Sequence, residues 1–181
     1  MSKEKEESNP FFLILGTPDA GKTSLLYRLY SGIFCTERYD SNRDFEELQV
    51  DKVRLRSLNI LENNLPKREW VKFVNGCSTV IYIIDTSTTE GILNGKQLFL
   101  DLDSSNLFQN IPLAIFANKS DIILYNKQQL EKDFMELGIQ SNPERIAIFN
   151  VSIKTSEGII SAMDWIMKKS NNFFYIPAFR E

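Results

Sequence analysis

Apolar and polar positions alternate along the chain in a pattern that predicts strands and helices in turn. Buried strands are predicted by short apolar or alternating runs at Phe11–Leu15, Val53–Ile60, Thr79–Ile84, Pro112–Ala117 and Arg145–Val151. Helices are predicted by apolar residues at helical spacing at Thr23–Tyr30, Gly91–Ser104, Asn126–Leu137 and Glu157–Lys169. In the second strand, the alternation places Val53, Leu55 and Ser57 on one face. Strands that alternate with helices predict an α/β domain with a mostly parallel sheet covered on both faces.

Composition narrows the chemistry that this fold can carry. The 181 residues fit one domain, and the net charge of −3 gives no reason to expect nucleic-acid binding. The chain has no His, which excludes His-based acid–base catalysis and His-ligated metals. Two cysteines, Cys35 and Cys77, are too few for a structural zinc site or a disulfide scaffold. There are only eight glycines, and none of them lies between residues 33 and 75.

We recognise no targeting signal at either end of the sequence. Residues 1–9 form a charged segment that we expect to be a flexible tail, and Ser2 stands where myristoylation needs glycine. No apolar run reaches 18 residues. We therefore expect a cytoplasmic protein without a lipid anchor of its own. Residues 171–181 form an aromatic extension, which we expect either to fold back over apolar surface or to bind a partner.

A phosphate-binding loop follows the first predicted strand. Gly16–Thr23 matches the pattern G-x-x-x-x-G-K-[ST] and opens a helix, so that backbone N–H groups and the helix N-terminus face the phosphates. Lys22 would reach the β- and γ-phosphates, and the Thr23 hydroxyl would bind Mg²⁺. The predicted phosphate-binding residues are Asp19, Ala20, Gly21, Lys22, Thr23 and Ser24.

Two further motifs follow later strands at the same edge of the predicted sheet. Asn118-Lys-Ser-Asp121 and Ser152-Ile-Lys154 closely resemble the guanine-recognition motifs of small GTPases. The resemblance implies that the Asp carboxylate binds the guanine N–H groups, that the Asn amide ties the base pocket to the phosphate loop, and that the two Lys stems sandwich the base. The implied guanine-binding residues are Asn118, Lys119, Asp121, Ser152, Ile153 and Lys154.

The resemblance covers residues 10–170 and is closest to the Arf/Arl branch of the Ras superfamily. Phe116–Ile122 and Gly158–Ile166 look like the fifth strand and last helix of that branch, and Trp70 lies fifteen residues before Asp85, as the switch II tryptophan does in the branch. It implies a P-loop NTPase small-GTPase fold with a six-stranded, mostly parallel sheet and about five helices. One departure is Pro18, which stands where Arf-type loops carry Asp.

The segments that sense the γ-phosphate in this family are altered. Aligning on Trp70 puts Asn59, Glu62 and Asn63 at the Asp, Gly and catalytic Gln positions of D-x-x-G-Gln. No Gly occurs between residues 33 and 75, so no register can restore that motif. Asp40 stands where switch I supplies a Mg²⁺-binding Thr, with Ser41 next to it. A nucleotide pocket is therefore predicted without the ordinary switch.

These observations favour a guanine-nucleotide-binding domain with little or no GTP hydrolysis, which holds GTP or GDP, with a weaker case for Mg²⁺. It would act as a protein-binding or assembly subunit through a face that includes Glu37–Glu47 and Asn63–Trp70, although Trp70 is also a candidate for core packing. An active GTPase that regulates trafficking with non-standard or partner-supplied catalytic residues is the alternative. A P-loop kinase or ATPase, with Asp85 as its acidic residue, is a third interpretation.

Overall fold

The computed structural model describes residues 10–36, 45–58, 66–105, 107–108, 110–122, 127–136 and 144–176. The strands in this part of the chain are β1 (Phe11–Gly16), β2 (Phe45–Val50), β3 (Val53–Leu58), β4 (Cys77–Asp85), β5 (Leu113–Asn118) and β6 (Ile146–Asn150). The helices are α1 (Lys22–Ser31), α2 (Lys67–Val74), α3 (Thr89–Asp103), α4 (Lys127–Glu136) and α5 (Ile159–Ser170).

The strands form one sheet in the order β2-β3-β1-β4-β5-β6. Only β2 runs antiparallel to its neighbour, and the other pairings are parallel. This arrangement confirms the predicted six-stranded, mostly parallel α/β fold. Because β1, β4, β5 and β6 are parallel, their carboxyl ends lie at one edge of the sheet, where ligands bind in such folds.

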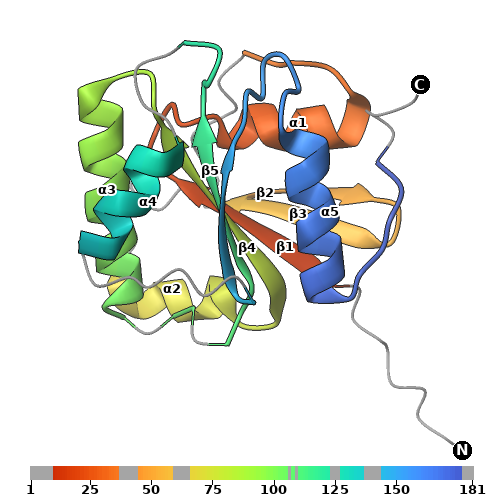
Figure 1. Cartoon of the computed structure of the whole chain (residues 1–181). Helices are drawn as coiled ribbons and strands as arrows, with labels where there is room; N and C mark the ends of the chain where they lie inside the picture. Colours follow the sequence, from red (N-terminus) through yellow and green to blue (C-terminus); the bar gives the residue numbers. More distant parts are fainter. Residues whose placement is uncertain are drawn as a thin grey trace, which may run out of the picture.

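Two hydrophobic cores hold helices against opposite faces of the sheet (Figure 1). One core joins α2, α3 and α4 to the sheet through residues such as Trp70, Phe99 and Phe134. The other joins α1 and α5 through residues such as Leu26 and Met163. Continuous apolar strands are stable here because both faces are covered. None of the helices in the described ranges has the length and apolar character needed to cross a bilayer.

The hydrophobic pattern did not locate β2 or α2, whereas β3 matches the strand predicted at Val53–Ile60. Glu46 points inward from β2 with 7% of its surface exposed, and it lies directly opposite Ser57 of β3. Its position in Glu37–Glu47 suggested that Glu46 is part of an exposed docking face. Its burial shows that it is not. Trp70 of α2 is 4% exposed and packs in the core, as its core-packing interpretation predicted.

The part of the C-terminal extension that the structure describes folds back onto the body. Phe174 and Ile176 are buried in the core beneath α1 and α5, and the Phe174 ring meets Phe12 of β1 edge-on with 5.5 Å between ring centroids. The backbone N–H of Tyr175 donates to the carboxylate of Asp51 in the β2–β3 turn. Of the two interpretations of this segment, folding back over apolar surface is the one observed for residues 171–176.

Candidate functional site

The loop between β1 and α1 closes tightly around its lysine. Lys22 is 5% exposed, and its ammonium donates to the Thr17 carbonyl of the same loop at 3.0 Å. Gly21, which precedes α1, has φ 110°, and a Cβ added there would lie 2.6 Å from the Asn118 amide nitrogen. Only glycine fits this close approach. The N-terminal N–H groups of α1 therefore open onto the loop, as phosphate binding requires.

The Thr23 hydroxyl lies beside a buried carboxylate that the sequence analysis did not assign to the site. It donates to Oε2 of Glu46 at 2.9 Å. The neighbouring Ser24 hydroxyl donates instead to the Cys35 carbonyl at 2.7 Å, away from the loop's interior. The signal for Glu46 was its place in strand register, since it alternates inward with Leu48 and Val50.

Asn118 joins the phosphate loop to the base pocket. Its amide nitrogen donates to the Ala20 carbonyl at 2.8 Å, and its amide oxygen accepts from the Ile153 backbone N–H at 3.1 Å. The side chain is at the end of β5 and is only 3% exposed. One amide thus connects three segments that are far apart in the sequence, as the family resemblance implied for this residue.

The remaining base-pocket residues are brought together at the ends of β5 and β6. The Ser152 hydroxyl donates to the Asp121 carboxylate at 2.7 Å and accepts from the Thr155 N–H at 3.1 Å. Asp121 and Lys154 are exposed, so their charged groups are accessible to a ligand. Arg28 of α1 braces the second loop by donating to the Ile153 carbonyl at 3.1 Å. Arg28 was not predicted as a site residue.

Lys119 is held by an acid at the end of the neighbouring strand. Its ammonium lies 2.6 Å from Oδ2 of Asp85, while the N–H and hydroxyl of Ser87 both donate to the other carboxylate oxygen. Burial would raise the pKa of Asp85, but the Lys119 and Ser87 hydrogen bonds outweigh it and hold that pKa below its usual value. Asp85 therefore stays ionised and orients Lys119.

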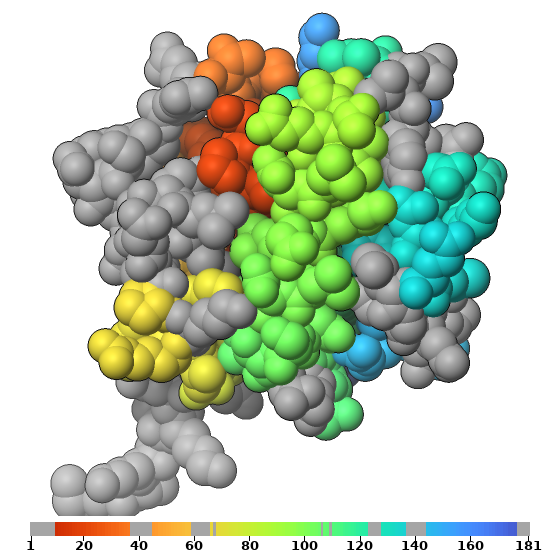
Figure 2. Space-filling view, turned by 90° about the vertical axis from the view of Figure 1, so that its left-hand side faces the viewer, coloured from red at the N-terminus to blue at the C-terminus, as the bar shows by residue number. Residues whose placement is uncertain are grey.

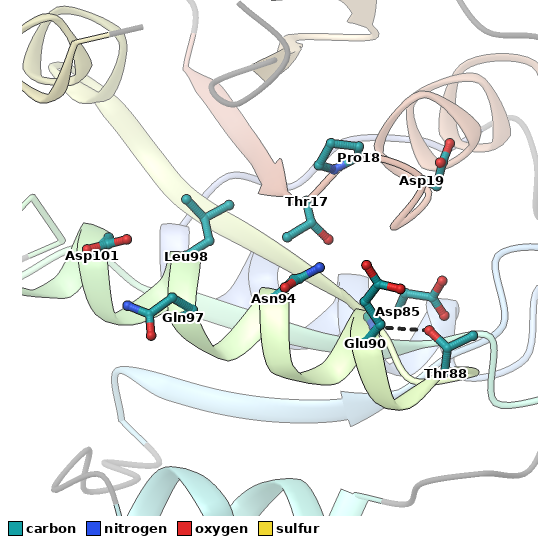
Figure 3. A pocket seen from close by; sticks show the side chains of 11 residues that line it. Thr17, Pro18, Asp19, Asp85, Thr88, Glu90, Asn94, Gln97, Leu98 and Asp101 are labelled. Carbon is teal, nitrogen blue, oxygen red and sulfur yellow. Dashed lines mark hydrogen bonds between the residues drawn. The ribbon is translucent and has the colours of Figure 1, made fainter. Parts of the chain in front are cut away.

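A cleft of about 570 Å³ separates the phosphate loop from α3. Figure 2 shows the red segment that contains the loop beside the light-green segment of α3. The cleft is lined on the loop side by Thr17, Pro18 and Asp19, and across from them by residues of β4 and α3 (Figure 3). Its carboxylates are those of Asp19, Asp85, Glu90 and Asp101. No lysine or arginine is among the residues that line it within the described ranges.

These residues fit a nucleotide and a magnesium ion chemically. The loop supplies backbone donors and a buried lysine for phosphates, the Thr23 hydroxyl and Glu46 carboxylate supply hard oxygen atoms for Mg²⁺, and Asp121 supplies an acceptor for a base. All the predicted phosphate- and guanine-binding residues lie at one edge of the sheet. The predicted switch positions Asp40, Ser41, Asn59, Glu62 and Asn63 lie outside the described residues.

Comparisons with known proteins agree with this architecture. The model of the ADP-ribosylation factor family matches residues 1–170. ADP-ribosylation factor-like protein 1 of Caenorhabditis elegans is 27% identical over 156 residues, 85% of each chain. ADP-ribosylation factor-like protein 1 of Saccharomyces cerevisiae is 28% identical over 159 residues, 86% of this chain and 84% of its own. ADP-ribosylation factor 3 of Arabidopsis thaliana is 25% identical over 154 residues, 85% of this chain and 84% of its own. The chain therefore belongs to the ADP-ribosylation factor family of small GTP-binding proteins.

Proposed function

We propose that this protein binds a guanine nucleotide, hydrolyses GTP slowly or not at all, and serves as a protein-binding or assembly subunit. One contrast carries the proposal. The pocket residues are joined to one another, since Asn118 ties the phosphate loop to the base loops, and this supports nucleotide binding. The sequence between residues 33 and 75, which should sense the γ-phosphate, has no glycine and so no D-x-x-G motif.

The base-pocket contacts support selectivity for guanine. Ser152 orients the exposed Asp121 carboxylate, which can accept hydrogen bonds from the ring N–H and the exocyclic amine of guanine. Adenine lacks that pair of donors and would leave the carboxylate unmatched. Lys119, held by Asp85, would cover one side of the base.

The phosphate end of the pocket supports slow hydrolysis. Transition-state stabilisation in phosphoryl transfer needs positive charge near the γ-phosphate. Lys22 supplies such charge from the loop, but the cleft beside the loop presents Asp19, Glu90 and the Lys119-paired Asp85, and its described lining carries no basic side chain. In the family alignment, Asn63 takes the place of the water-orienting Gln and is one methylene shorter. The altered switch segments would then serve as a fixed protein-binding face.

The test is to identify the nucleotide held by the gently purified protein and to follow its fate. Denaturation should release GDP or GTP close to one per chain, and GDP should raise the melting temperature where ADP does not. Protein reloaded with GTP should release no phosphate in a single turnover over many hours. A nucleotide-free protein that neither GDP nor GTP stabilises would overturn the binding proposal, because a ligand of the native state must stabilise it.

An active GTPase with a partner-supplied arginine is the second candidate, and the acidic cleft is the observation that favours it. The carboxylates that line the cleft, of which Asp85 already pairs with Lys119, would attract a guanidinium group. This candidate predicts phosphate release from bound GTP that accelerates when guanidinium ion is added at low millimolar concentration. If no phosphate is released in a single turnover even when guanidinium is present, the non-hydrolysing subunit remains the better proposal.

A further inference from the structure

The buried carboxylate of Glu46 beside the Mg²⁺-binding threonine has no role in the function proposed above. Glu46 lies on β2 and faces α1, and its Oε2 is 2.9 Å from Oγ1 of Thr23. Strand register explains why it points there. The antiparallel pairs are Glu46 with Ser57, Leu48 with Leu55, and Val50 with Val53, and the inward-facing side chains of these pairs approach the same core as α1.

The spacing of these two oxygen atoms suits a shared cation. Mg²⁺ takes six oxygen ligands at about 2.0–2.1 Å in a nearly ideal octahedron, so adjacent ligands stand about 3 Å apart. The 2.9 Å between Thr23 Oγ1 and Glu46 Oε2 matches that separation without any movement of either side chain. Both are hard oxygen donors of the kind that Mg²⁺ prefers, and the carboxylate adds the negative charge that a hydroxyl lacks.

A separate observation concerns Ser57, the residue that pairs with Glu46 across the β2–β3 hairpin. Ser57 is fully buried, and its hydroxyl has no hydrogen-bond partner among the residues that the structure describes. It lies directly opposite Glu46 across the β2–β3 pair and beside Ile14 of β1, two residues before the phosphate loop begins. Directly opposed residues place their Cβ atoms about 5 Å apart. A buried polar group is normally satisfied by protein or by ordered water, so a ligand that brings an oxygen atom to this face of the sheet, as a hydrated Mg²⁺ would, offers this hydroxyl a partner once neighbouring side chains move to admit it.

We infer that Glu46 is a magnesium ligand of this protein, which acts with Thr23 and replaces the ligand that an ordinary switch I threonine would supply. The sequence provides the reason for such a replacement, because the family's switch I Thr and its D-x-x-G Asp are Asp40 and Asn59 here. The inference rests on the proposed function, since the nucleotide's phosphates would complete the coordination. It makes Mg²⁺ binding depend on β2 as well as on the phosphate loop.

The test measures how Mg²⁺ slows the release of a fluorescent GDP analogue from the full-length chain. Wild type, Glu46→Gln and Glu47→Gln are loaded in EDTA, and release rates are followed as free Mg²⁺ is raised. Glu47 is the matched control, because it is the next carboxylate on the same strand but faces outward and pairs with Arg56. Wild type and Glu47→Gln should share one midpoint, whereas Glu46→Gln should need at least about tenfold more Mg²⁺. Release in EDTA should agree within about twofold for wild type and Glu47→Gln, and the Mg²⁺ response of each form is measured against its own rate in EDTA.

The outcomes separate this inference from the function on which it rests. Nucleotide loading with the same Mg²⁺ midpoint in Glu46→Gln and wild type would overturn the role of Glu46 alone, as would tighter Mg²⁺ binding in the variant. If no form of the protein loads nucleotide, the proposed function fails and the inference fails with it. Should Glu46→Gln not fold, Glu46→Asp replaces it. Its retracted carboxylate should shift the midpoint at least about threefold, and an unshifted midpoint would again overturn the inference.

Discussion

Replacing Asn118 by alanine tests whether one amide holds the pocket together. The side chain is 3% exposed and makes two hydrogen bonds, to the Ala20 carbonyl at 2.8 Å and from the Ile153 N–H at 3.1 Å. Alanine removes both partners at once and leaves a buried acceptor and a buried donor unsatisfied. Each unsatisfied group costs about 1–3 kcal/mol, so the free energy of unfolding should fall by about 2–6 kcal/mol. In a domain of this size, that loss lowers the melting temperature by about 4–24 °C.

The assay is urea unfolding followed by circular dichroism, without nucleotide and with excess GDP. Asn94→Ala is the control, because Asn94 is an exposed residue on α3 and its replacement should change stability by less than about 0.5 kcal/mol. A second variant, Asn118→Asp, keeps an oxygen that accepts from Ile153 but puts a carboxylate oxygen against the Ala20 carbonyl. It should be at least as destabilising as alanine above about pH 5, where the carboxylate is charged.

Two results would refute this reasoning. If Asn118→Ala loses no more stability than the Asn94→Ala control, the bridge does not hold the loops together. If the variant loses stability but gains as much from GDP as wild type does, the bridge supports the fold and not the pocket. We expect the variant to gain less from GDP, because the loops must be brought together again when the nucleotide binds.

Four further predictions follow from individual contacts. Asp85→Asn should lower the free energy of unfolding by about 1–3 kcal/mol at pH 7, because Lys119 loses its ionised partner. Since the pKa of Asp85 is lowered in the folded state, this difference in stability from wild type should be full above about pH 5 and shrink as the pH falls below about 4. Phe174→Ala should cost about 3 kcal/mol in urea unfolding, whereas Phe173→Ala, at a position 66% exposed, should cost less than about 0.5 kcal/mol. Burial raises the pKa of Cys77 to about 12, so with the other cysteine replaced by serine, a thiol reagent at pH 8 should label the folded protein at least about a hundredfold more slowly than the unfolded chain. GDP should bind more tightly than a non-hydrolysable GTP analogue in calorimetry at fixed Mg²⁺, because the acidic cleft disfavours further negative charge, and tighter binding of the GTP analogue would contradict that electrostatic argument.

The buried strands could be predicted because their chemistry is local. β1 and β5 are covered on both faces, so that each reads as an unbroken apolar run, and turn residues mark where they end. β2 was missed because its sequence Phe-Glu-Glu-Leu-Gln-Val places Glu46 at a core-facing position, which hides the alternation expected of a half-buried strand. α2 was missed because eight residues with several charges make a short helix whose burial of Trp70 depends on the rest of the fold.

The candidate site divides in the same way. The phosphate loop and each of the two base motifs are single short stretches of sequence. Residue types and spacing were therefore sufficient to predict that they follow strands at one edge of the sheet. The contacts of Glu46 with Thr23 and of Asp85 with Lys119 join segments 23 and 34 residues apart, and they exist only because of sheet register. Register follows from the packing of the whole sheet, which no single segment of the sequence contains.

The two ends of the pocket are built on different physical principles, and this difference bears on how the protein works. The base end is held by hydrogen bonds within the protein itself, through Asn118 and Ser152, so little ordering remains to be done when a base binds. The phosphate end instead carries carboxylates at the loop, with Asp19 in the loop itself and Glu46 in contact with Thr23. Carboxylates there oppose an incoming phosphate unless a cation lies between them, so binding at this end should be conditional on Mg²⁺ or on a cationic group from a partner. We therefore expect the preformed base pocket to select the nucleotide. Binding of its phosphates should then depend on whether Mg²⁺ or a cationic group of a partner is present.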